Sequence, residues 1–93
     1  MPQVEDNPAT GRFEMGSGDG TAFVEYRRAG ERIALLHAEV PEALSGQGVG
    51  SKLVGGTLDA VRAEGSKVVP RCEFVAAYIG RRPEYRDLLA DEG

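Results

Sequence analysis

Three glycines at alternate positions, Gly46, Gly48 and Gly50, separate an apolar run ending at Val40 from a helical pattern beginning at Val49. Glycine lets the backbone approach a ligand closely and adopt dihedral angles that other residues avoid. The first turn of a helix offers N–H groups without an acceptor inside the helix, and the helix dipole there favours an anion. The stretch therefore predicts a phosphate-binding loop; the alternative is a flexible glycine-rich loop without a ligand.

The spacing of these glycines does not match two common phosphate motifs. A Walker A loop ends in Gly-Lys-Ser/Thr, whereas Gly50 is followed by Ser51 and Lys52. The dinucleotide fingerprint needs a third glycine at a position that Ser51 or Leu53 occupies in this chain, depending on the starting glycine.

Two residues suited to proton transfer lie just before the loop. On a regular strand Ile33, Leu35, His37 and Glu39 share one face. The histidine and the carboxylate should then lie together near the carboxyl end of the strand, where α/β sheets bind their ligands. In the alternative interpretation His37 is a hydrogen-bonded core residue and Glu39 is paired with an arginine.

Cys72 is the only cysteine of the chain, which excludes an internal disulfide and suits a reducing cytosol. A lone cysteine is a candidate site residue or simply a small buried apolar side chain. Both interpretations stay open on the residue alone.

The elements that would position these residues predict an α+β domain. Alternating or β-forming residues predict strands over 12–15, 21–28, 32–40 and 67–70. A helical stripe predicts a helix over 49–64 ended by Gly65, with further short helices after residue 71 and from Pro83. Gly55 and Gly56 inside the long helix suggest a close approach to a strand. Residues 1–10 are predicted to be a flexible lead-in, 11–89 a single domain and 90–93 a frayed tail.

The composition of the chain limits the classes of partner that we expect it to bind. The formal net charge of −4 argues against a nucleic-acid backbone and tolerates a cationic amine. The N-terminus has no signal-peptide pattern, and no run reaches the ~20 apolar residues of a transmembrane helix. We therefore expect a cytoplasmic protein that binds neither nucleic acid nor membrane. It should be a monomer, or a homodimer formed through an open sheet edge.

Four segments taken together resemble the GNAT superfamily of N-acetyltransferases. In chain order they are His37-Ala38-Glu39-Val40-Pro41, Gly46-Gln47-Gly48-Val49-Gly50, Val69-Pro70-Arg71-Cys72-Glu73-Phe74 and Arg82-Pro83-Glu84-Tyr85-Arg86-Asp87-Leu88. They are similar to a branch of minimal, single-domain predicted acetyltransferases, and the likeness spans about residues 11–89. The coenzyme A loop of the superfamily follows Gln/Arg-x-x-Gly-x-Gly/Ala. Gly48 and Gly50 fill its small positions, Ser45 replaces the usual Gln or Arg, and Arg82 stands where the branch often has His or Asn.

The resemblance implies a fold and a cofactor. The fold would be a truncated GNAT fold of the α+β, sandwich-like class. It would have antiparallel N-terminal strands, one strand–helix–strand unit that binds acetyl-coenzyme A, and short C-terminal helices. The cofactor would contact Val40 with its pantetheine arm and place its pyrophosphate on a loop formed by Gly46, Gln47, Gly48, Val49, Gly50 and Ser51.

The resemblance also implies a chemistry, with no metal involved. The protein would transfer an acetyl group directly to an unidentified amine, either a small molecule or a protein lysine or N-terminus. Glu39 would act as the base, supported by His37, and Cys72 would be either a nucleophile or the group that protonates the departing thiolate. Tyr78 and Tyr85 are alternative acids. Two other functions stay open: a non-catalytic coenzyme A-binding module, and a protein-interaction domain whose loop binds another anion.

Overall fold

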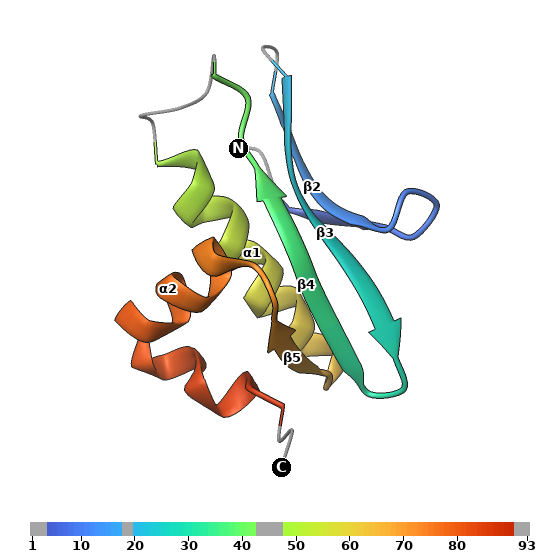
Figure 1. Ribbon diagram of the computed structural model, residues 1–93. Coiled ribbons are helices and arrows are strands. Elements are labelled where there is room, and N and C mark those ends of the chain that lie inside the picture. Colours follow the sequence, from blue (N-terminus) through green and yellow to red (C-terminus); the bar gives the residue numbers. More distant parts are fainter. Residues whose placement is uncertain (1–3, 18–19, 43–47, 91–93) are drawn as a thin grey trace.

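A single mixed sheet with strand order β1-β2-β3-β4-β5 organises the molecule (Figure 1). The computed structural model describes residues 4–17, 20–42 and 48–90. Along the chain the elements are β1 (Glu5–Asn7), β2 (Arg12–Ser17), β3 (Gly20–Ala29), β4 (Arg32–Glu39), α1 (Val49–Glu64), β5 (Lys67–Pro70), α2 (Glu73–Arg81) and the 3-10 helix η2 (Pro83–Leu88). Strands β1 to β4 are antiparallel neighbours, and β4 and β5 are parallel. The predicted α+β class is confirmed.

The ends of the chain differ from the prediction. Strand β1 lies inside the predicted lead-in of residues 1–10 and pairs with β2, with Asp6 opposite Phe13. That part of the segment is therefore strand and not flexible lead-in. At the other end the N–H of Ala90 donates to the carbonyl of Val68 (2.8 Å). Residues 1–3 and 91–93 lie outside the described residues.

The hydrophobic core lies on one face of the sheet. Inward residues of β2, β3 and β4 pack against the apolar stripe of α1, and α2 and η2 complete the same cluster. The predicted stripe is confirmed, because Leu53, Val54, Leu58 and Val61 are fully buried. The opposite face carries side chains that are exposed or half-buried, namely Arg12, Glu14, Phe23, Glu25, His37 and Glu39.

Gly55 and Gly56 in the middle of α1 are explained by contacts on two sides of the helix, neither of them with a strand. A Cβ added to Gly55 would lie 2.8 Å from the hydroxyl oxygen of Tyr78 on α2. A Cβ added to Gly56 would lie 2.5 Å from a methyl carbon of Val4, just before β1. The predicted close approach is therefore real, but the predicted partner was wrong.

A β-bulge interrupts the pairing of β4 with β3. Glu25 pairs with His37, but the next residue of β3, Tyr26, pairs with Leu35, so Leu36 has no partner on β3. An extra residue in one strand shifts its side-chain alternation by one position. Residues of β4 after the bulge therefore face the opposite way from what a regular strand predicts.

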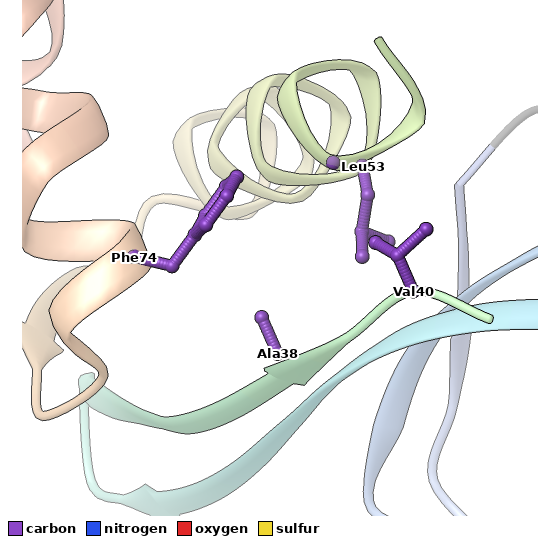
Figure 2. A pocket seen from close by; sticks show the side chains of 5 residues that line it. Ala38, Val40, Leu53 and Phe74 are labelled. Atoms are coloured by element: carbon purple, nitrogen blue, oxygen red, sulfur yellow. The ribbon is translucent and has the colours of Figure 1, made fainter. Parts of the chain in front are cut away.

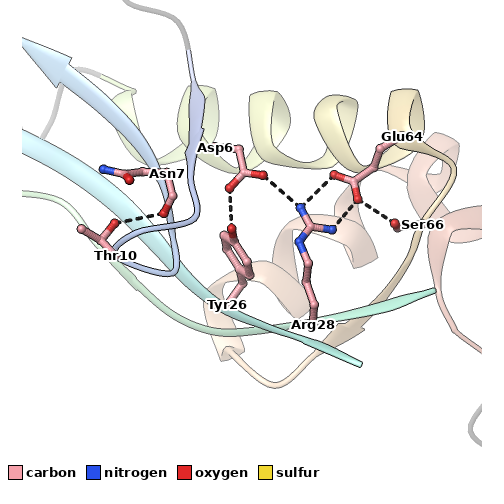
Figure 3. Close-up of polar contacts among 7 residues, drawn as sticks. All are labelled: Asp6, Asn7, Thr10, Tyr26, Arg28, Glu64 and Ser66. Atoms are coloured by element: carbon pink, nitrogen blue, oxygen red, sulfur yellow. Dashed lines mark hydrogen bonds and ion pairs between the residues drawn. The ribbon is translucent and has the colours of Figure 1, made fainter. Parts of the chain in front are cut away.

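A polar network fastens β1 and β3 to the end of α1 (Figure 3). The guanidinium of Arg28 donates to both carboxylate oxygens of Glu64 and to Asp6 (3.0 Å). Tyr26 donates its hydroxyl hydrogen to Asp6, and Ser66 donates to Glu64 (2.7 Å). The hydrogen bond from Arg28 lowers the pKa of Glu64, which keeps this carboxylate charged.

The C-terminal helix η2 is held on α1 by a second set of polar contacts. The Tyr85 hydroxyl donates to Asp59 (2.8 Å), and the Arg62 guanidinium donates to Asp87 (2.7 Å) and to the carbonyl of Glu84 (2.7 Å). Burial of the phenol, together with its hydrogen bond to Asp59, raises the pKa of Tyr85 to about 12.

We expect the Tyr85 contact to be lost at alkaline pH. The phenol holds its proton more tightly in the folded chain than at the ordinary pKa of about 10. Its contribution to stability is therefore complete below about pH 10 and is lost as pH rises toward about 12. Denaturant unfolding of the wild type and Tyr85→Phe across this window should show the steeper loss of stability in the wild type. Equal slopes would contradict the assignment.

Candidate functional site

A small apolar cavity lies between the end of β4, the first turns of α1 and the start of α2 (Figure 2). Its volume is about 200 Å³, and it is lined by Ala38, Val40, Gly50, Leu53 and Phe74. The bulge is what turns Ala38 and Val40 toward the core side, where both pack against the buried cluster. The side chains around the cavity are hydrocarbon, so it suits a slender apolar segment of a ligand.

Strand β4 has a free edge beside this cavity. Its pairing with β5 ends at Leu35 and Pro70. The Leu35 carbonyl then accepts the N–H groups of Arg71 (3.0 Å) and Cys72 (3.0 Å), where the chain leaves the sheet to begin α2. In the ranges that the structure describes, no strand pairs with β4 beyond Leu35 on this side. A ligand with amide groups can therefore lie along this edge as a further strand.

Among the described residues, the start of α1 has no side-chain cap. Gly48 is the N-cap residue, makes no side-chain cap hydrogen bond, and is followed by a first turn without an acidic residue. The N–H of Lys52 bonds to the Gly48 carbonyl (3.1 Å), so the N–H groups of Val49, Gly50 and Ser51 lack a helical acceptor. These groups suit an anion, as the sequence predicts. The predicted cofactor residues Gly46 and Gln47 lie outside the described residues.

Glycine is favoured at the two described positions of the motif, Gly48 and Gly50, for different reasons. Gly48 adopts a left-handed conformation (φ 73°), and a Cβ added to it would meet no atom within 4 Å. Gly50 has no positive φ, but its Cβ would lie 2.9 Å from the Cζ atom of Phe74. Backbone geometry favours glycine at the first position, and at the second a side chain would displace the ring of Phe74.

The structure brings His37 and Glu39 together on the open face of the sheet. The His37 Nε2 and Glu39 Oε2 atoms are 3.8 Å apart, and the two side chains are 57% and 61% exposed. Ile33 and Leu35 are fully buried on the other face. The prediction that all four residues share one face is therefore wrong, and the reason is the bulge at Leu36. The alternative of a core histidine is wrong as well.

Cys72 lies at the junction between β5 and α2. It is the N-cap residue of α2 and is a free, half-buried thiol whose side chain packs against the core. It does not line the cavity, but Phe74 does, two residues further along. Its backbone N–H to Leu35 fixes it where β4 and β5 separate.

The sequence patterns did not single out Phe74 as a cavity residue, and it entered only as the last residue of one of the four segments. Val75, Tyr78 and Ile79 form the buried side of α2, whereas Phe74 is 43% exposed. A large aromatic residue beside the buried stripe of a helix was the available signal. The alternative acids do not line the cavity: the hydroxyl of Tyr78 faces Gly55, and Tyr85 is bonded to Asp59.

Two kinds of feature are absent from the described ranges. None of the helices there is long and apolar enough to cross a membrane. Nor do the described side chains include a group of three or more His, Cys, Asp or Glu residues arranged to hold a metal ion.

Comparisons with known proteins agree with this geometry. The family model of the GCN5-related N-acetyl-transferases matches residues 12–88. Protein NATD1 of Gallus gallus is 35% identical over 63 residues, which cover 67% of this chain and 57% of that protein. The Homo sapiens protein has the same identity, with 56% of its length covered. The chain thus matches little more than half the length of these curated relatives.

A solved structure resembles the whole chain. It is the NMR solution structure of a GCN5-like protein from Staphylococcus aureus. The match has a TM-score of 0.71 and 25% sequence identity, and it covers 100% of this chain and 94% of that one.

Proposed function

The chain belongs to the GCN5-related N-acetyltransferase family, and from this premise we propose that it transfers an acetyl group from acetyl-coenzyme A to an amine. The family and the truncated GNAT fold predicted from the four segments are confirmed. One observation carries the proposal. The apolar cavity, the free edge of β4 and the start of α1 meet at the end of β4 that carries the His37–Glu39 pair, with the cavity on the core side of the strand and the pair on its open side.

Two parts of the cofactor would bind to two different parts of this site. Its pyrophosphate would accept hydrogen bonds from the first N–H groups of α1, from Val49 to Ser51, and from the loop before them. Its pantetheine arm would run along the edge of β4 near Val40, with its amides on the main chain and its methylene groups in the cavity. Acetyl-coenzyme A itself supplies the reactive thioester, so the task of the protein is to bind the cofactor and orient it.

Side chains of the protein would accept and donate the protons of the reaction. The amine nitrogen forms a bond to the thioester carbon, the carbon–sulfur bond breaks, and the amine loses a proton. Glu39 would accept that proton, directly or through a water, while His37 at 3.8 Å holds the carboxylate in position. Cys72 would donate a proton to the departing thiolate, from its place where β4 and β5 separate. A reducing cytoplasm keeps this thiol free.

The exposure of the pair bears on the acceptor. With more than half of each side chain accessible, Glu39 and His37 can reach an amine on a small molecule as well as a lysine or N-terminus of a protein. The same openness favours a second candidate function, a coenzyme A-binding module without catalysis. Turnover with a panel of amines separates the two.

Cofactor binding is tested most directly at Gly48. Asn and Asp tolerate the left-handed conformation better than other residues and differ mainly in charge. Calorimetric titration should show saturable binding of acetyl-coenzyme A to the wild type and to Gly48→Asn. Gly48→Asp should bind roughly tenfold more weakly than Gly48→Asn, because a carboxylate a few ångströms from the pyrophosphate costs about 1–2 kcal/mol. Absence of binding to the wild type would overturn the proposal.

A further inference from the structure

Phe74 is placed unlike the other apolar residues of α2. It stands in the first turn of the helix, is 43% exposed, and lies outside the buried core cluster. Its ring extends toward α1 and forms one side of the cavity (Figure 2). A ring that is 43% exposed lacks part of the hydrophobic stabilisation that full burial would give. Folding alone therefore does not account for its position beside the cavity.

Gly50 makes the position of this ring possible. Glycine within a helix costs about 1 kcal/mol relative to alanine, and Gly50 has no backbone conformation that requires it. A Cβ at this position would lie 2.9 Å from Cζ of Phe74 and 3.5 Å and 3.6 Å from its two Cε atoms. A methyl group here would push the ring away from α1.

We propose that Gly50 and Phe74 act as one unit that sets the width of the cavity for the pantetheine arm of coenzyme A. Gly50 is needed to admit the ring, not to admit the phosphates, and Phe74 is the specificity-determining residue for the arm. The inference rests on the proposed function, because it assigns the cavity to that cofactor.

The shape and chemistry of the cavity favour the pantetheine arm over the nucleotide half. The lining residues Ala38, Val40, Leu53 and Phe74 offer hydrocarbon surface to methylene and methyl groups. The free edge of β4 beside them offers hydrogen bonds to the amides of the arm. A phosphate in this cavity would lose its hydration without gaining charged partners. Phosphates can instead accept hydrogen bonds from the N–H groups at the start of α1.

The first test compares two probes on one substitution. Coenzyme A and phosphoadenosine diphosphate, its nucleotide half, are titrated calorimetrically into the wild type and Phe74→Ala. Phe74→Ala should weaken coenzyme A by roughly tenfold and leave the nucleotide within about twofold, because only the arm contacts the ring. Leu89→Ala, which removes a comparably exposed apolar side chain at the C-terminal end, should change neither affinity. Thermal unfolding of each variant verifies that it is folded.

The second test is a double-mutant cycle with Gly50→Ala. Alone, Gly50→Ala should weaken coenzyme A by displacing the ring; in the Phe74→Ala background it should have no further effect. Equal losses in both backgrounds, with the nucleotide also weakened, would mean that Gly50 serves the phosphates and would overturn the inference. Unchanged coenzyme A affinity in Phe74→Ala would overturn it while leaving the proposed function standing. A wild type that binds neither probe would overturn both.

Discussion

Glu39→Gln should reduce acetyl transfer by on the order of a hundredfold to ten-thousandfold while acetyl-coenzyme A binds almost as well as before. The amide has the size of the carboxylate but cannot accept the proton that the attacking amine releases. The Glu39 side chain is 61% exposed and does not line the cavity, so its replacement should cost little stability or cofactor affinity. Loss of turnover with binding retained distinguishes a base from a binding residue.

Release of the coenzyme A thiol, measured over a panel of small amines and lysine peptides, reports this turnover. Glu31→Gln is the matched control, because it removes the same charge from an exposed position in the turn that precedes β4, far along the strand from Glu39. Equal turnover of Glu39→Gln and the wild type would contradict the role of Glu39.

In the same assay Cys72→Ala should slow the reaction without abolishing it, and an acetyl group found on Cys72 would instead establish that Cys72 is a nucleophile. Binding without turnover on any amine would favour the non-catalytic module.

The parts of the fold that could be predicted from the sequence are those set by local rules. Gly65 has the left-handed conformation expected at the C-terminal end of a helix, and Gly48 adopts a backbone conformation that glycine allows. The apolar stripe of α1 and the parallel pairing of β4 with β5 follow from spacing and connection length. The cavity lies next to the glycine motif because this motif joins β4 to α1, and residues of both elements line the cavity.

The parts that escaped prediction depend on contacts between distant segments. Nothing in Leu35-Leu36-His37 differs from a regular strand, and the bulge arises from the register that β4 adopts against β3. This one residue decides which face carries His37 and Glu39. The polar strand β1 is likewise held by Tyr26 and Arg28, through hydrogen bonds that cross the sheet. The dependence of Gly50 on Phe74 is a contact between two helices and has no local signature.

The same kind of contact makes Gly55→Ala and Gly80→Ala an informative pair of opposite sign. Gly55 lies in the middle of α1 and Gly80 in the last turn of α2, and replacing either by alanine should gain up to about 1 kcal/mol of helix propensity, less at Gly80 than at Gly55. Gly80 is exposed with no atom within 4 Å of an added Cβ, so Gly80→Ala should stabilise the protein. Gly55 is buried, and its Cβ would lie 2.8 Å from the Tyr78 hydroxyl oxygen. Overpacking costs about 1–3 kcal/mol, which outweighs the gain, so Gly55→Ala should destabilise.

Removing one oxygen atom should reverse that sign. After the hydroxyl, the nearest Tyr78 atom to the added Cβ is Cζ at 3.7 Å, an ordinary contact distance. Tyr78→Phe should therefore rescue Gly55→Ala and let the propensity gain appear, a coupling that denaturant unfolding of the four variants of the cycle measures directly. If Gly55→Ala and Gly80→Ala stabilise equally, the spacing of α1 and α2 is not limited by this hydroxyl. If the rescue is observed, glycine at position 55 is there to let α2 dock with the tyrosine in place, the same kind of role that we propose for Gly50 and the ring of Phe74.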